Sequence, residues 1–155
     1  MGSFCLVKDI RSKNRLLQAA SGWDDAQIQD RIDDKTCEIL SELRDRFPDQ
    51  LTIADWLFDP PFSVPKLIRA ICVELVIGQC LIDAYGSDAR ISEQGWMILG
   101  KGLRALERLK QDPVILEVDG TKIEGKSNLI ELSSFEEVDD EDEISMAEFI
   151  NGLGE

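Results

Sequence analysis

The chain has 155 residues, enough for one domain with a sizeable hydrophobic core. Its net charge is −14, and the charge is uneven: residues 131–155 hold ten acidic residues and no basic one, whereas residues 1–130 hold all 17 basic residues. This balance argues against DNA binding through phosphates, which depends on Lys and Arg, and favours an acidic interaction tail.

The start of the chain, MGSFCLVKDIRSK, has no continuous apolar stretch, so we expect no signal peptide. The pattern of residues 7–20 predicts a first helix. Asp24 predicts the N-cap of a second helix over 24–47, because apolar residues recur on one face until Pro48. The cysteines are widely spaced, and we expect them to be buried free thiols of a reducing compartment: Cys5, Cys37, Cys72 and Cys80.

Residues 48–64 predict an irregular connection, because Pro60-Pro61 forbids a regular helix. The connection is rich in apolar side chains, which should pack on the core or on another subunit. Its candidate inter-subunit residues are Trp56, Phe58 and Phe62.

Residues 65–85 predict a central helix that begins at Pro65, because the segment is apolar nearly all round. The apolar run at 67–82 within it is too short to span a membrane, and Arg69 and Glu74 interrupt it. We therefore expect this helix to form the centre of the core.

A fourth helix is predicted over 92–111, with Ser92 as its N-cap. Spacing of three and four residues predicts a core stripe of Trp96, Leu99, Leu103 and Leu106. Three glycines weaken this helix, which suggests close approach of a neighbouring backbone: Gly95, Gly100 and Gly102. A basic group on another face has three possible roles: it could contact phosphates, it could be solvated, or, as is better motivated, it could contact acidic surface of a neighbouring subunit. Its members are Lys101, Arg104 and Arg108.

Alternating apolar and polar residues around Asp119-Gly120 predict a β-hairpin at about 114–124. Apolar residues return near the chain end, where we expect a docking helix, about 144–153, that contacts a partner through Ile144, Met146, Phe149, Ile150 and Leu153. The expected fold is mainly α: a small four-helix bundle with a β-hairpin over residues 1–124, followed by an extended acidic C-terminal arm over residues 125–155.

The acidic segment also imitates a calcium-binding EF-hand loop. If Glu148 takes the twelfth loop position, then Glu137, Asp139 and Glu141 take positions one, three and five. The sixth position requires glycine for a sharp turn but holds Asp142, and no second hand is present to pair with it. We therefore expect no metal site in this segment.

We expect no catalytic centre and no cofactor. The chain has no histidine, which removes the commonest general base and a common metal ligand. Paired carboxylates such as Asp24-Asp25 are better explained as helix capping, and no Gly-rich phosphate loop is present.

The elements follow one another in a distinctive order. A CLVKDI start leads to a helix ending in ILSELRDRF, then a Pro-containing loop, VPKLIRAICVELVIGQCLIDAYG, WMILGKGLRALERLKQ and a small β element. The most specific part is a V-P-x-L-x-x-A pattern at Val64, Pro65, Leu67 and Ala70. Over about residues 5–124 the chain thereby resembles the head-to-tail connector, or adaptor, proteins of tailed bacteriophages, although its loop and acidic arm are longer than in compact members.

This resemblance implies a structural protein of the virion neck that is present in the host cytoplasm during assembly. Such adaptors form a ring, usually twelve-fold, beneath the portal protein, and a C-terminal extension commonly inserts into the portal. The other face receives the next neck or tail-completion protein, and genomic DNA passes through without specific binding.

Two other hypotheses remain open. One is a cytosolic regulatory module whose acidic tail binds a basic partner or calcium. The other is a different virion component, such as a tail-completion or terminase-associated protein.

Overall fold

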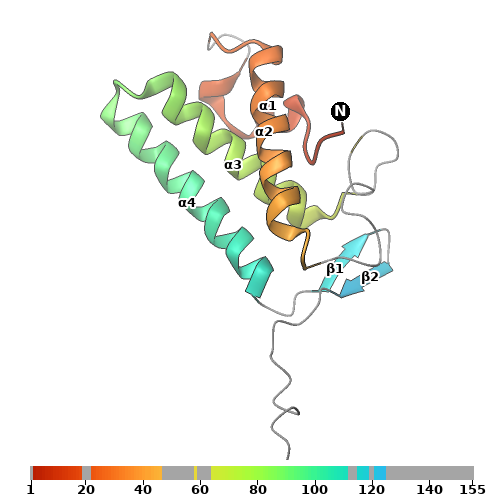
Figure 1. Ribbon diagram of the computed structural model, residues 1–155. Coiled ribbons are helices and arrows are strands. Elements are labelled where there is room, and N and C mark those ends of the chain that lie inside the picture. Colours follow the sequence, from red (N-terminus) through yellow and green to blue (C-terminus); the bar gives the residue numbers. More distant parts are fainter. Residues whose placement is uncertain are drawn as a thin grey trace, which may run out of the picture.

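The computed structural model describes residues 2–18, 22–46, 58, 64–111, 115–118 and 121–124 (Figure 1). This part of the chain is mainly helical, as predicted. Its helices are α1 (Val7–Lys13), the short 3-10 helix η1 (Arg15–Leu17), α2 (Asp25–Leu43), α3 (Lys66–Tyr85) and α4 (Ala89–Gln111). The strands β1 (Ile115–Val118) and β2 (Thr121–Glu124) follow α4 and pair in antiparallel register, with Ile115 opposite Glu124.

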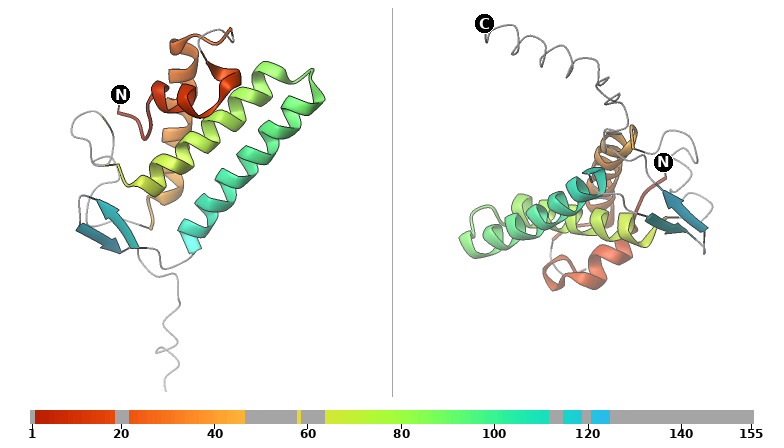
Figure 2. Two further views of the ribbon diagram at one scale, coloured as in Figure 1. Left: turned by 180° about the vertical axis from the view of Figure 1, so that it is seen from behind. Right: turned by 90° about the horizontal axis from the view of Figure 1, so that it is seen from below.

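Helix α3 is the central element, and both α2 and α4 pack on it (Figures 1 and 2). Because its sequence is apolar nearly all round, α3 buries side chains on more than one side. Its buried residues are Ile68, Ile71, Cys72, Val73, Leu75, Val76, Ile77, Gly78, Cys80 and Leu81.

Helix α2 begins at the predicted cap. The Asp24 side chain accepts a hydrogen bond from the Gln27 backbone N–H at 2.7 Å, and the Gln27 side chain accepts one from the Asp24 N–H at 3.1 Å. This reciprocal capping satisfies two donors that a helix start otherwise leaves without a partner. The apolar face of α2 is buried as its spacing predicts, at Ile28, Ile32, Ile39 and Leu43.

The first helix is shorter than the predicted span of 7–20. It ends at Lys13 because Asn14 has an extended backbone, and the Asn14 side chain accepts a hydrogen bond from the Leu16 N–H at 2.9 Å. A local side-chain bond of this kind competes with the helical ladder and starts η1 instead.

The fourth helix begins three residues before the predicted Ser92. The Asp88 carboxylate accepts hydrogen bonds from the backbone N–H groups of Arg90 and Ile91, at 3.0 and 3.3 Å, and thereby caps α4. Aspartate and serine are both good N-caps, so the sequence alone did not decide between them.

Helices α3 and α4 approach each other closely at glycines. A Cβ atom added at Gly78 would lie 2.6 Å from the Leu99 backbone nitrogen. At Gly95 it would lie 3.0 Å from the Gly78 carbonyl oxygen, and at Gly102 it would lie 2.8 Å from the Leu75 side chain. The expected close approach is therefore confirmed at Gly95 and Gly102.

This approach determines which side of α4 is buried. The buried residues are Gly95, Leu99, Gly102, Leu106 and Leu109. The predicted core stripe is wrong for Trp96 and Leu103, which are 61% and 42% exposed. Gly95 and Gly102 allow α3 to come nearer to α4 than bulky side chains would. More atoms therefore make contact when the side of α4 with these glycines faces α3.

Candidate protein-binding surface

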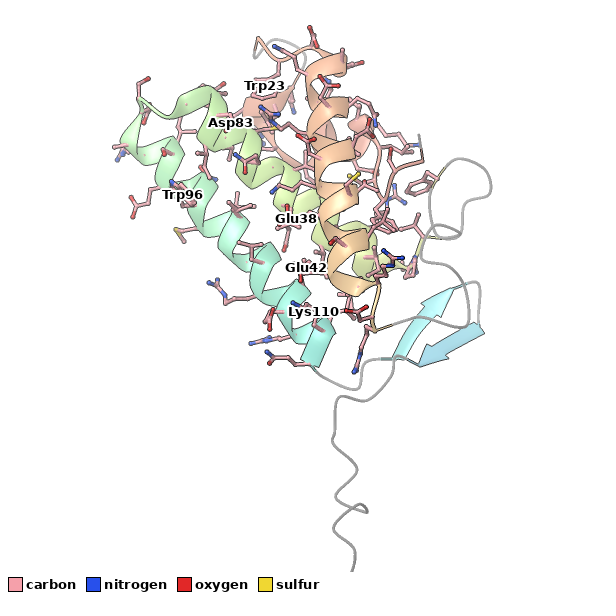
Figure 3. All side chains as sticks on the ribbon, in the orientation of Figure 1. Trp23, Glu38, Glu42, Asp83, Trp96 and Lys110 are labelled. Atoms are coloured by element: carbon pink, nitrogen blue, oxygen red, sulfur yellow. The ribbon has the colours of Figure 1, made fainter. Side chains whose placement is uncertain are left out.

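Among the described elements, helix α4 packs mainly on α3, and several side chains on its other side are exposed. That side has two adjacent rows of side chains. Trp96 and Leu103, seven residues apart, form one row. Met97, Arg104 seven residues later and Arg108 four residues after that form the other. These five residues are called the outward face of α4. Its Trp96 and Met97 side chains are the most exposed large apolar groups among the described residues, at 61% and 69%. Figure 3 labels Trp96 on α4. A cluster of large apolar side chains of this kind is typical of a binding surface.

The basic residues of α4 differ in how they are paired. The Lys101 ammonium forms an ion pair of 2.5 Å with Glu74 of α3, so it is held by its own chain. Arg104 and Arg108 are exposed and form no ion pair with the described residues. Two of the three predicted basic residues can therefore receive carboxylates from elsewhere.

A groove of about 340 Å³ runs beside the outward face, between α2 and α4. Leu103 and Arg104 belong to both the groove and the outward face. On its α2 side, the Glu42 carboxylate accepts a hydrogen bond of 2.6 Å from Lys110, and this bond raises the pKa of Lys110 (Figure 3). The α2 side of the groove is thus occupied by internal pairs, and its apolar contact surface comes from α4.

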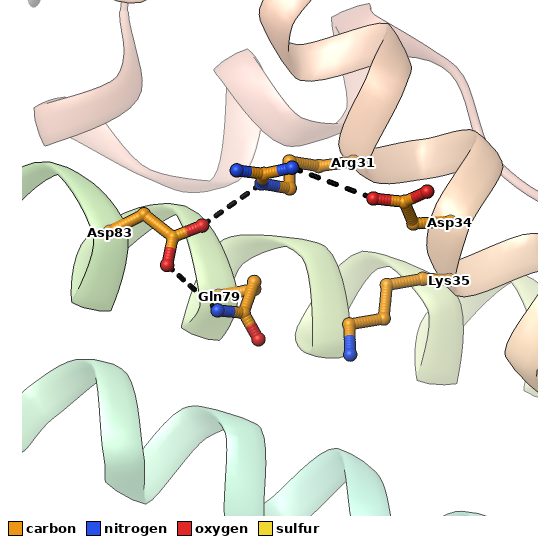
Figure 4. A pocket seen from close by; sticks show the side chains of 5 residues that line it. All are labelled: Arg31, Asp34, Lys35, Gln79 and Asp83. Atoms are coloured by element: carbon orange, nitrogen blue, oxygen red, sulfur yellow. Dashed lines mark hydrogen bonds and ion pairs between the residues drawn. The ribbon is translucent and has the colours of Figure 1, made fainter.

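A second hollow, of about 310 Å³, lies between α2 and α3 (Figure 4). The Asp83 carboxylate accepts hydrogen bonds from Arg31 at 2.9 Å and from Gln79 at 2.8 Å. Arg31 also pairs with Asp34 at 3.5 Å. These polar groups bind one another and join α2 to α3, so the hollow is better explained as a structural network than as a ligand site.

The Asp9 carboxylate at the start of α1 is largely buried, with its side chain 14% exposed. Arg69 of α3 donates two hydrogen bonds to it, at 2.5 and 3.1 Å, and the Leu6 N–H donates a third at 3.0 Å. Partial burial opposes ionisation of Asp9, but these hydrogen bonds outweigh it and hold the pKa of Asp9 below its usual value. The Asp9–Arg69 pair therefore joins α1 to α3.

Three of the cysteines are buried as expected, whereas Cys37 is exposed. The Cys5 and Cys72 sulfurs lie 3.3 Å apart. This contact and burial raise the pKa of Cys5 well above its usual value, and burial raises the pKa of Cys80 to about 12. Buried thiols of such high pKa are poor nucleophiles, so they serve packing.

Apart from the basic residues of α4, the predicted site residues fall into two groups. Phe58 packs within its own chain: its backbone N–H donates to the Ser3 carbonyl oxygen at 2.9 Å, and the Arg69 guanidinium lies 5.1 Å from its ring centre. The others lie outside the described residues, namely Trp56 and Phe62 in the loop and Ile144, Met146, Phe149, Ile150 and Leu153 in the arm.

Sequence reasoning did not identify the apolar part of the outward face. The spacing predicts core positions for Trp96 and Leu103, and no pattern in the sequence distinguishes Met97. The seven-residue spacing of Gly95 and Gly102, in register with Leu99 and Leu106, was the available signal that α3 contacts a different side.

Comparison with protein-family models, with curated proteins and with solved structures found no match for this chain. None of the described helices combines the length and apolar character needed to cross a membrane. Within the described ranges, no three His, Cys, Asp or Glu side chains are grouped as they would be around a metal ion. The outward face of α4 is therefore the strongest candidate functional surface in this part of the chain.

Proposed function

We propose that the chain is a structural protein of a bacteriophage neck, a ring subunit that joins the portal to the tail. The observation that supports this most is the outward face of α4, an apolar and basic surface on a helix that packs mainly on one neighbour. The resemblance of the helix order, with α3 following the Val64 to Ala70 pattern, suggests which class of assembly this surface serves.

A ring needs two different surfaces on each subunit that fit each other. Helix α2 is the candidate complement to the outward face, because its six acidic and two basic residues give it a net negative charge. Several of its carboxylates form ion pairs within the chain, but those of Asp25 and Asp34 remain 74% and 68% exposed. The two helices pack on different sides of α3 (Figure 1), so contact between α4 of one subunit and α2 of the next is head-to-tail, the type that closes rings. Opposite charges would set the orientation of the contact.

The portal contact is proposed for the C-terminal helix expected at about 144–153. Its apolar residues would fill a groove of the portal, with the acidic residues before it as a solvated spacer. The proposed ring is twelve-fold, and its negative charge keeps DNA from adhering as it passes.

Co-purification with a tagged portal protein from the same genome tests this proposal. A chain with Ile144, Phe149 and Ile150 all changed to Ser should lose the portal, whereas the matched control with Leu129→Ser and Ile130→Ser should retain it. Normal portal binding by a chain that lacks residues 136–155 would contradict the proposed contact.

The exposed α4 surface also suits a regulatory interaction module, which is the second candidate function. Its acidic arm would bind a basic partner or calcium. Titration calorimetry with calcium separates the two: micromolar binding favours the regulatory module, and no heat of binding favours the adaptor.

A further inference from the structure

We infer that in the free chain the outward face of α4 is a binding surface for the chain's own C-terminal segment, residues 136–153. The outward face offers three large apolar side chains beside two arginines without an ion-pair partner among the described residues. The segment has the opposite composition: acidic residues fill 136–143 almost completely, and apolar residues recur from Ile144 to Leu153. Each half of the surface therefore meets a matching half of the segment.

The open side of α4 also contains a glycine that packing within the chain does not require. Gly95 and Gly102 are needed where α3 approaches, but a Cβ atom at Gly100 would meet only the end of the flexible Arg104 side chain, at 3.4 Å. Glycine within a helix is unfavourable relative to alanine, so one without an internal packing reason suggests contact with something outside the helix bundle. Gly100 lies between Trp96 and Leu103 on the same side of α4, and its lack of a side chain would give room there to a bulky group such as Phe149.

The chain is long enough for its own segment to reach this surface. Trp96 lies about 22 Å along α4 from Gln111, at 1.5 Å per residue. The antiparallel strands bring Glu124 back beside Ile115, so the 14 residues of 112–114 and 125–135 separate α4 from residue 136. A random-coil tether of that length would span about 19–22 Å on average. A tether that matches the distance gives an effective concentration in the millimolar range, so the chain's own segment competes well against a second copy.

This contact goes beyond the proposed assembly role and does not depend on it. The same segment is proposed to enter the portal, and the same α4 surface is proposed to meet a neighbouring subunit. An internal contact would keep both surfaces covered in the free chain, and a portal that takes the segment would uncover α4. The test uses the isolated full-length chain, so its result is independent of any portal experiment.

Fluorine NMR of the full-length chain labelled with fluorotryptophan provides the measurement. The chain has three tryptophans, and the Trp96→Phe variant identifies the Trp96 signal. We expect the double variant F149S/I150S to shift the Trp96 signal and leave the Trp23 signal in place. The matched control L129S/I130S, which makes the same change outside the proposed segment, should leave both signals in place.

A double-mutant cycle shows whether the arginines take part. In a chain with R104E/R108E, adding F149S/I150S should cause no further shift of the Trp96 signal, because the segment has already left α4. The chemical shift of the Trp96 signal in the original chain should also stay the same across a dilution series. An identical Trp96 signal in the original chain and in F149S/I150S would overturn the inference. A shift that disappears on dilution, together with a dimer seen by light scattering, would overturn it in favour of a second copy.

Discussion

At the scale of single residues, the contact between Asp9 and Arg69 joins the start of the chain to the central helix. Asp9 accepts hydrogen bonds from both Arg69 and the Leu6 N–H, so one carboxylate caps α1 and also anchors α3. Residues so far apart in sequence could not be paired from the sequence, because any of the 17 basic residues was a possible partner.

We expect Asp9→Asn to lower the free energy of unfolding by about 1–2 kcal/mol at neutral pH, a value reduced for the partial exposure of Arg69. Because the folded pKa of Asp9 lies below the unfolded value of about 3.9, the ionised form stabilises the fold above that pH. This contribution is lost as the pH falls through the folded pKa. Denaturant unfolding at several pH values should show the two proteins converging in acid, and a constant difference would contradict the account.

The exposure of the thiols gives a second prediction at this scale. Cys37 is exposed, whereas Cys5, Cys72 and Cys80 are buried. A thiol reagent such as Ellman's reagent should therefore label one thiol of the native chain quickly and the other three only on unfolding. The Cys37→Ala variant should lose the fast phase, and a fast phase that survives in this variant would show that a buried thiol is accessible.

At the scale of elements, the sequence predicted best where one strong signal acts alone. The Asp24 cap placed the start of α2 correctly, and the apolar run placed α3 within one residue. Prediction from the sequence failed where two signals compete. Asp88 and Ser92 are both suitable caps for α4, and Asn14 interrupts a pattern that otherwise continues as a helix.

The orientation of α4 could not be predicted from its leucines, because they occur on more than one side of the helix. The side with Trp96 and Leu103 has the same seven-residue spacing as the side with Leu99 and Leu106. The residues that decide the orientation are Gly95 and Gly102. Their contribution to packing depends on the distance between α3 and α4, which is known only once the two helices are packed together. For this reason the exposure of Trp96 and Leu103 could not be predicted from the sequence.

The glycines of this helix pair provide a prediction with an internal control. Gly78→Ala should destabilise the fold by about 1–3 kcal/mol, because the added methyl would overlap the backbone of Leu99. Gly100→Ala introduces the same methyl group where there is room, so it should be neutral or stabilise by up to about 1 kcal/mol. Urea unfolding measures both, and equal effects of the two changes would contradict the close approach of α3 and α4.

At the scale of the whole molecule, the chain combines a stable helical core with an open surface on α4 and an acidic, partly apolar end. The core explains why the fold forms, since α3 is buried between its neighbours. The predicted loop and arm residues lie outside the described ranges, so the docking role of Ile144, Phe149 and Ile150 stays a prediction. The charge division between residues 1–130 and 131–155 was readable from sequence because it needs no knowledge of contacts.

The central claim is that this chain assembles as a ring on a portal. Native mass spectrometry of the full-length chain mixed with the portal protein of the same genome tests it most directly. We predict a complex with a full ring of the chain, twelve copies on one portal, and a smaller number of bound copies for the R104E/R108E variant. A chain that remains unbound in the presence of an intact portal would contradict the account.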